Sequence, residues 1–223
     1  MHKQTLVKKM LTISVLLCLA VIIHAGNEPP AAPVQSDGTW LDAGFEAGKL
    51  PAGWEIPGSG RRDVSLTNGC CILNPGKGDN YLAMPFLKND LDQDFVIEMD
   101  FCIPEPVKGP YSLFAMIREG GNFQLVLSPT GSVQSVTMNS LVSLGAIKPG
   151  AVYTVAVLCH PDGTYEGTLA GPGIEKPAVR AYAGPDGALN KMVLGNTYGA
   201  GVGSVAIGRV RIGRPLQRER ISR

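Results

Sequence analysis

Charged, histidine and aromatic side chains are all scarce in this sequence. Lys and Arg number 20 against 19 Asp and Glu, a formal net charge of +1, and 17% of the residues are charged. A chain this close to neutral cannot supply the counterion-release free energy on which nucleic-acid binding depends, so nucleic acid is excluded as a partner. The three histidines and the lack of any C-x-x-C spacing argue against a structural zinc site.

The apolar run near the start of the chain is too short to span a bilayer comfortably. Lysines precede a continuous apolar run from Met10 to Ile23, and a small residue, Ala25, follows it. This layout is typical of a secretory signal, whereas a membrane-spanning helix needs roughly 18 apolar residues. We therefore expect residues 1–25 to be removed as a signal peptide, with no transmembrane segment left. The mature chain is expected to be secreted, periplasmic or at the cell surface.

The mature chain divides into three parts by composition. Residues 26–38 are rich in Pro, Ala and Gly without apolar periodicity, which predicts a linker. Residues 39–213 are enough for one large β domain that buries on the order of 70% of its unfolded surface. Residues 214–223 are basic and unpatterned, and we interpret them as a solvated tail. Removal of the signal takes away three lysines and no acidic residue, so the mature net charge is −2.

Four cysteines remain after cleavage: Cys70, Cys71, Cys102 and Cys159. An even number in an exported chain allows up to two disulfides, and small buried apolar residues are the equally weighted alternative. The adjacent pair, Cys70 and Cys71, would point to opposite faces of a strand and so would not bond to each other.

Helical periodicity is absent, and short alternating or β-branched runs separated by Gly, Pro, Asn and Asp predict an all-β chain. Eleven strands are expected, enough for two packed antiparallel sheets, since one open sheet would expose an apolar face. The segments PTGS at 129–132 and PDGT at 161–164 predict tight hairpin turns. The expected strands are 40–45, 63–73, 81–86, 95–103, 111–118, 122–128, 132–138, 152–159, 164–169, 191–194 and 204–212.

The order of these segments resembles the concanavalin A-like lectin/glucanase superfamily, in the laminin-G-like jelly-roll form common in exported bacterial proteins. The resemblance covers about residues 40–213 and is carried by FEAGKLPAGWEI, DFVIEMDFCI, GGNFQLVLSPTGSV, KPGAVYTVAVLCHPDGTYEGTLAG and SVAIGRVRIG. It implies a two-sheet sandwich whose concave sheet holds glycans. Gly208 and Arg209 stand where relatives often carry acidic residues, so the resemblance does not support a calcium site, and no cofactor is expected.

The strand DFVIEMDFCIPE, residues 94–105, contains the candidate carboxylates. Alternation sends Phe95 and every second residue to Ile103 into the core, and it sends Glu98 and Asp100 outward, onto a polar solvated face or into a ligand groove. Glucanases that this string resembles carry a second Glu two or three residues after Glu-x-Asp, where this chain has Cys102 and Ile103. Glu105 would lie roughly 23 Å from Glu98 along an extended strand, far beyond the roughly 5 Å that retaining glycosidases need. No catalytic residue is therefore assigned.

Several other side chains are candidates for contact with a sugar. Arg118, Asn122 and Gln124 offer directional donors that match vicinal hydroxyls, although exposed strands often carry such residues for solubility alone. Trp54 is a candidate stacking platform, together with Trp40 and Tyr198, or alternatively a plug at the end of the core. His160 is interpreted as a turn residue.

The sequence thus favours an exported, non-catalytic module that binds a polysaccharide or glycan or makes contacts at the cell envelope. One alternative is a hydrolase or lyase of the same superfamily that uses Glu98 and Asp100. A second alternative is a structural surface domain without a small ligand.

Overall fold

The computed structural model describes residues 36–56, 63–67, 69–74, 80–84, 93–118, 121–136, 141–175, 177, 179–183, 189–196 and 203–215. These residues form fourteen strands and no helix. Within this part of the chain, therefore, no helix is long and apolar enough to cross a membrane. The strands are β1 (Ser36–Ala43), β2 (Val64–Thr67), β3 (Cys70–Leu73), β4 (Asn80–Ala83), β5 (Phe95–Cys102), β6 (Tyr111–Arg118), β7 (Gly121–Leu127), β8 (Ser132–Val136), β9 (Leu141–Ala146), β10 (Val152–Cys159), β11 (Thr164–Ala170), β12 (Arg180–Ala183), β13 (Leu189–Asn196) and β14 (Val205–Pro215).

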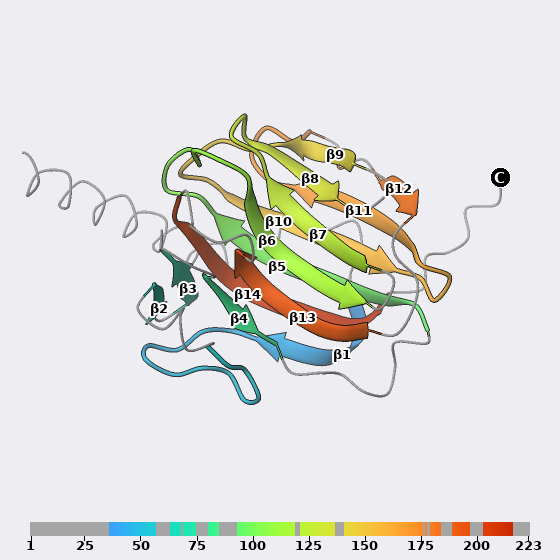
Figure 1. Ribbon diagram of the computed structural model, residues 1–223, viewed down its shortest axis with the longest axis horizontal. Coiled ribbons are helices and arrows are strands. Elements are labelled where there is room, and N and C mark those ends of the chain that lie inside the picture. The colour runs from blue at the N-terminus through green and yellow to red at the C-terminus, as the bar shows by residue number, and fades with distance from the viewer. Residues whose placement is uncertain are drawn as a thin grey trace, which may run out of the picture.

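The strands build two antiparallel sheets that pack face to face. One sheet has eight strands in the order β12-β11-β10-β5-β14-β3-β2, with β1 also paired to β14, and the other has six in the order β4-β13-β6-β7-β8-β9. In Figure 1 the six-stranded sheet lies in front, with β5 and β10 behind it. The predicted all-β, two-sheet antiparallel sandwich is confirmed.

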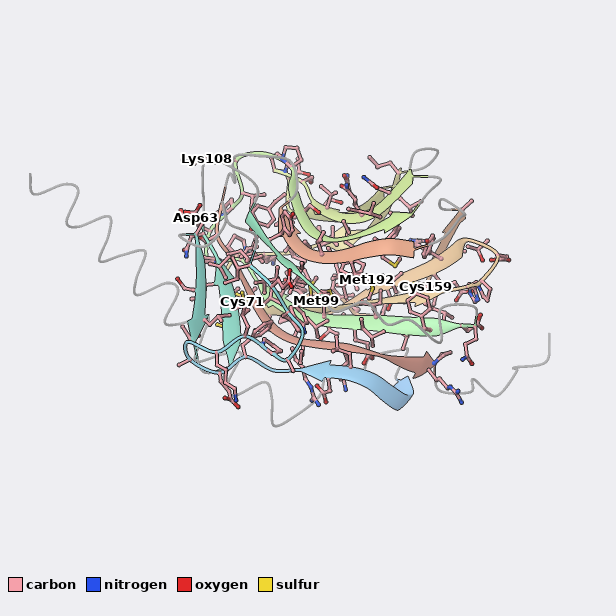
Figure 2. All side chains as sticks on the ribbon, turned by 60° about the horizontal axis from the view of Figure 1, so that its bottom comes forward. Asp63, Cys71, Met99, Lys108, Cys159 and Met192 are labelled. Atoms are coloured by element: carbon pink, nitrogen blue, oxygen red, sulfur yellow. The ribbon has the colours of Figure 1, made fainter. Side chains whose placement is uncertain are left out.

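The core lies between the sheets and follows the alternation of the strands. Phe95, Ile97, Met99 and Phe101 of β5 are all buried in one cluster with Met192 of β13. Figure 2 shows Met99 and Met192 in the layer between the two sheets. The predicted inward face of β5 is therefore confirmed, because period-two alternation places these apolar groups on one side of the strand.

Both predicted hairpins are present and have the same backbone geometry. In the β7–β8 turn the Gly131 N–H donates to the Ser128 carbonyl at 2.9 Å, and in the β10–β11 turn the Gly163 N–H donates to the His160 carbonyl at 3.1 Å. The two glycines have φ of 79° and 81°, a left-handed conformation that costs glycine nothing. A Gly in this position is typical of a hairpin loop that ends in a β-bulge.

The structure differs from the expected strands at four places. The run 63–73 is two strands, β2 and β3, because Gly69 with φ of 90° turns the chain between them. The edge strands β9 and β12 were not predicted, since they are largely exposed and so lack a regular apolar alternation. Strand β1 begins at Ser36, inside the segment expected to be a linker. Residues 1–35, 85–86, 137–138 and 216–223, on which other predictions rest, lie outside the described residues.

Candidate functional site

Strand β5 presents its second face on the outer surface of the eight-stranded sheet, away from the core. Val96, Glu98 and Cys102 on this face are nevertheless buried, and Asp100 is half-buried. The prediction of a solvated face is therefore wrong for Glu98, which is 2% exposed. Alternation gives the direction of a side chain, but neighbouring strands and their side chains decide how much water reaches it.

Glu98 lies in a row of residues that crosses four neighbouring strands. Its Cα partners are Ala156 on β10 and Arg211 on β14, and Arg211 is in turn the partner of Asp42 on β1. The Arg211 guanidinium lies 3.0 Å from Oε2 of Glu98. A carboxylate, a guanidinium and a second carboxylate therefore follow one another across the sheet.

A β-bulge in β14 adds a second arginine to this surface. Ile207 pairs with Phe101 and Val210 with Met99, so Gly208 and Arg209 together oppose the single residue Asp100. The extra residue keeps Val210 in the core and directs Arg209 outward. Arg209 donates through Nε to Asp42 Oδ1 at 2.7 Å and through Nη2 to Asp42 Oδ2.

We refer to Asp42, Glu98, Asp100, Arg209 and Arg211 as the ionic cluster. Its outer members are open to water, with the Arg209 side chain 50% exposed, Asp42 39% and Arg211 26%. The bidentate hydrogen bond from Arg209 lowers the pKa of Asp42 and in return raises that of Arg209. Asp100 accepts a hydrogen bond from the Thr154 hydroxyl at 2.6 Å.

Glu98 is the buried member of the cluster, and its hydrogen bonding is incomplete. Both carboxyl oxygens are buried, and no described residue donates a hydrogen bond to either, since the 3.0 Å contact with Arg211 is an ion pair that lacks hydrogen-bond geometry. Burial raises the pKa of Glu98, the nearby Asp100 raises it further, and Arg211 opposes both effects. Within the described part of the chain, the ion pair with Arg211 is therefore the interaction that holds the Glu98 carboxyl group.

The other predicted contact residues lie on the opposite side of the sandwich. Asn122 and Gln124 are on β7, and their neighbours Phe123 and Leu125 are in the core, so both side chains point outward from the six-stranded sheet. Asn122 is exposed, whereas Gln124 is buried with its Oε1 unpartnered. Arg118 belongs to β6 of the same sheet, and its side chain lies outside the described residues. The structure therefore places Asn122 and Gln124 on the outer face of one sheet, and Glu98 and Asp100 on the outer face of the other.

The aromatic candidates do not form a stacking platform in the described part of the chain. Trp54 is 5% exposed and packs edge-on against Phe45, with ring centroids 5.9 Å apart. The core-plug alternative is thus the one that the structure supports. The Trp40 side chain and Tyr198 lie outside the described residues.

His160 and the cysteines take structural positions. The His160 N–H donates to the Thr164 carbonyl at 2.9 Å within the predicted turn, and the ring contacts Asp94 at 3.0 Å. All four cysteines are buried, and Cys71 lies in the main core while Cys70 belongs to a separate cluster with Cys102. The prediction that the adjacent pair points to opposite faces is confirmed. Among the described residues, no group of three or more His, Cys, Asp or Glu side chains could hold a metal ion.

Sequence reasoning missed three members of the cluster: Asp42, Arg209 and Arg211. The signal that could have found the arginines is Arg209-Val210-Arg211, in which one apolar residue is flanked by two cations. Alternation places both arginines on the face opposite to Val210. Nothing local to Asp42 indicates that it would meet them.

Comparison with known proteins gives similarities of fold only. No family model and no curated protein matches the sequence. Among solved structures, a sialidase of Trypanosoma rangeli is 12% identical with a TM-score of 0.54, covering 90% of this chain and 36% of the sialidase. The binding domain of botulinum neurotoxin serotype D is 12% identical with a TM-score of 0.57, covering 81% of this chain and 49% of that one.

A third similar structure is a bifunctional GH43-CE protein of Bacteroides eggerthii, 11% identical with a TM-score of 0.55 over 78% of this chain and 27% of that one. Another structure of the sialidase holds sialic acid. The chain spans less than half the length of each of these proteins. At such low identities the comparison supports the β-sandwich fold alone.

Proposed function

We propose that this chain is an exported, non-catalytic carbohydrate-binding module that uses the ionic cluster, in a laminin-G-like sandwich of the concanavalin A-like superfamily. The observation that carries the proposal is the placement of five charged side chains on one sheet surface, where Asp42 and Arg209 are partly exposed and fixed to each other by two hydrogen bonds. Donors and acceptors fixed on neighbouring strands suit the vicinal hydroxyls of a sugar ring.

The cluster combines an accessible rim with a rigid base. Asp42 and Arg209 are partly exposed and locked to each other by two hydrogen bonds, so they present fixed groups to a ligand. Asp100 is anchored by Thr154 and half-buried. Side chains that are already ordered lose little entropy on binding, which favours a binding function for this sheet surface.

The similar structures add support of a limited kind. One of the similar sialidase structures is a complex with sialic acid, and this chain covers 36% of that protein. We therefore propose by analogy that the ligand of this chain is a carbohydrate, and we take no particular reaction from the similar structures.

Retention of the protein on immobilised polysaccharides tests the proposal. We expect the parent protein to be retained and the double variant Asp42→Ala, Arg209→Ala to lose at least roughly tenfold in affinity, because both exposed rim groups are gone. Glu105→Gln is the matched control, since Glu105 is an exposed carboxylate after β5 and outside the cluster. Absence of retention by the parent protein across a broad panel would instead favour a structural surface domain.

A second candidate function is a hydrolase or lyase that uses Glu98 and Asp100. One observation favours it: the raised pKa of Glu98, since a carboxyl that keeps its proton can act as a general acid. Burial of Glu98 at 2% exposure and its ion pair with Arg211 argue against direct contact with a scissile bond. Sugar release from a polysaccharide panel that Glu98→Gln abolishes would favour the enzyme over the binding module.

A further inference from the structure

We infer that strand β1 is a pH-dependent strap, because Asp42 on β1 and Glu98 on β5 compete for the guanidinium group of Arg211 on β14. The attachment of β1 to β14 is strongest while Asp42 is ionised and Glu98 is neutral, and it weakens as Glu98 ionises. The strap is a property of the fold and does not depend on whether the chain binds a carbohydrate.

Strand β1 is held at the edge of the eight-stranded sheet. Among the described strands it pairs with β14 alone, and Figure 1 shows it at the lower margin of the molecule. Its register with β14 shifts between Ser36 and Thr39 and again between Thr39 and Leu41. Each shift interrupts the backbone ladder, so the regular pairing and the side-chain contacts from Leu41 onward carry more of the attachment. An edge strand of this kind can open locally while the rest of the sandwich stays folded.

Arg211 stands between two carboxyl groups. Its Cα partners are Asp42 on one side and Glu98 on the other. Its guanidinium group lies 3.0 Å from Glu98 Oε2 without hydrogen-bond geometry, and its charge also lowers the pKa of Asp42. One cation therefore stabilises both carboxylates. An ionised Glu98 attracts this cation towards β5 and repels the charge of Asp42, and both effects weaken the hold of β14 on β1.

Asp42 and Glu98 titrate in different pH ranges. The hydrogen bonds from Arg209 lower the pKa of Asp42, so Asp42 is ionised throughout the range in which Glu98 titrates. Burial raises the pKa of Glu98, and the charge of Asp42 adds to this effect. Release of β1 removes that charge, so the pKa of Glu98 is higher with β1 attached than with β1 released. The contribution to attachment is therefore present at low pH and is lost as pH rises through the pKa of Glu98 in the attached state.

Only one of the charged groups that act on Glu98 lies on β1. In decreasing order of effect on its pKa, these groups are Arg211, Asp100, Arg209 and Asp42. Two of them belong to β14 and one to β5 itself, and the partner of Glu98 on β10 is the uncharged Ala156. Opening of β1 thus changes the charge around Glu98 through Asp42.

Hydrogen exchange of the full chain, followed by NMR at a series of pH values on both sides of the ordinary carboxyl pKa of 4.5, tests the strap. After correction for intrinsic exchange rates, protection of the protected β1 amides should fall roughly two- to fivefold as Glu98 ionises, the size expected for partly exposed charges. This exchange should be insensitive to low concentrations of urea, because local opening exposes little surface. Constant protection, or a urea dependence equal to that of the β10 amides, would overturn the inference.

Two isosteric variants assign the effect to the competing carboxyl groups. Glu98→Gln should hold the β1 amides, at every pH, at the protection that the parent shows before Glu98 ionises. Asp42→Asn should lower the protection and remove its dependence on pH, so it decides the question even where Glu98→Gln does not fold. Glu105→Gln, an exposed carboxylate outside the cluster, should reproduce the parent profile, and thermal melting shows whether each variant is folded. A parent-like fall with pH in either Glu98→Gln or Asp42→Asn would overturn the inference.

Discussion

At the scale of the residue, two carboxyl groups of the same cluster respond oppositely to their surroundings. Asp42 receives two hydrogen bonds from Arg209, which stabilise its charged form and lower its pKa. Glu98 lies within the same network but is buried without a hydrogen bond from any described residue, so desolvation dominates and its pKa rises. The local supply of donors, rather than the residue type, sets the sign of the shift.

These shifts predict opposite pH dependences of stability for two isosteric variants. The raised pKa of Glu98 means that the folded state binds the extra proton, so its contribution to stability is lost as pH rises from the ordinary pKa of 4.5 through the folded value. Relative to the parent protein, Glu98→Gln should gain in free energy of unfolding over that range. The free energy of unfolding of Asp42→Asn should fall relative to that of the parent as pH rises from the lowered pKa towards the ordinary value of 3.8. The reason is that ionisation of Asp42 stabilises the parent.

Chemical denaturation at a series of pH values checks both signs in one experiment. The difference between variant and parent is the quantity compared, so that other titrating groups cancel. Stability curves that run parallel for Glu98→Gln and the parent would contradict the raised pKa of Glu98 in the folded protein.

At the scale of the element, one β-bulge lets strand β14 supply side chains both to the core and to the outer surface. It contributes Val210 and Ile212 to the core, and it delivers Arg209 and Arg211 to the outer surface of the eight-stranded sheet. Because two residues oppose Asp100, the strand keeps its inward register on both sides of the bulge.

Because the bulge sends Val210 into the core and Arg209 outward, truncating these adjacent residues should lower the free energy of unfolding by unequal amounts. Val210→Ala should lower the free energy of unfolding by about 2 kcal/mol, since it removes two methyl groups from a fully buried position. Arg209→Ala should cost less than about 1 kcal/mol, because its ion pair with Asp42 is half-exposed and screened. Urea unfolding measures both, and equal losses would be inconsistent with an outward Arg209.

At the scale of the whole molecule, the sandwich separates two sets of polar residues that a linear sequence places close together. Asn122 lies 24 positions after Glu98 in the chain, yet the two point outward from opposite sheets. The two packed sheets are separated by a core about 10 Å thick, so one small ligand cannot contact both outer faces.

This separation predicts which surface substitutions affect binding. Asn122→Arg should change the affinity for a polysaccharide by no more than about twofold, because it lies across the core from the cluster. Asp42→Arg should abolish binding, because it places a third cation beside Arg209 and removes an acceptor. Affinity electrophoresis in polysaccharide gels measures both variants under one condition. Loss of binding in Asn122→Arg alone would move the proposed site to the six-stranded sheet.

The sequence by itself determined the features that depend on short-range periodicity. Alternation in residues 95–103 identified the buried face of β5, and Pro-x-Gly segments located both hairpins, since these patterns are set by backbone geometry over a few residues. The number of these segments was enough to predict two packed sheets.

Only the tertiary structure decided the composition of the candidate site. Asp42 and Arg209 are 167 positions apart, and their pairing depends on β1 and β14 being neighbours in one sheet. The burial of Glu98 and the separation of Gln124 from it likewise follow from sheet order and packing. Local pattern fixes the side of a strand on which a residue lies, whereas long-range strand pairing fixes the charges that it meets there.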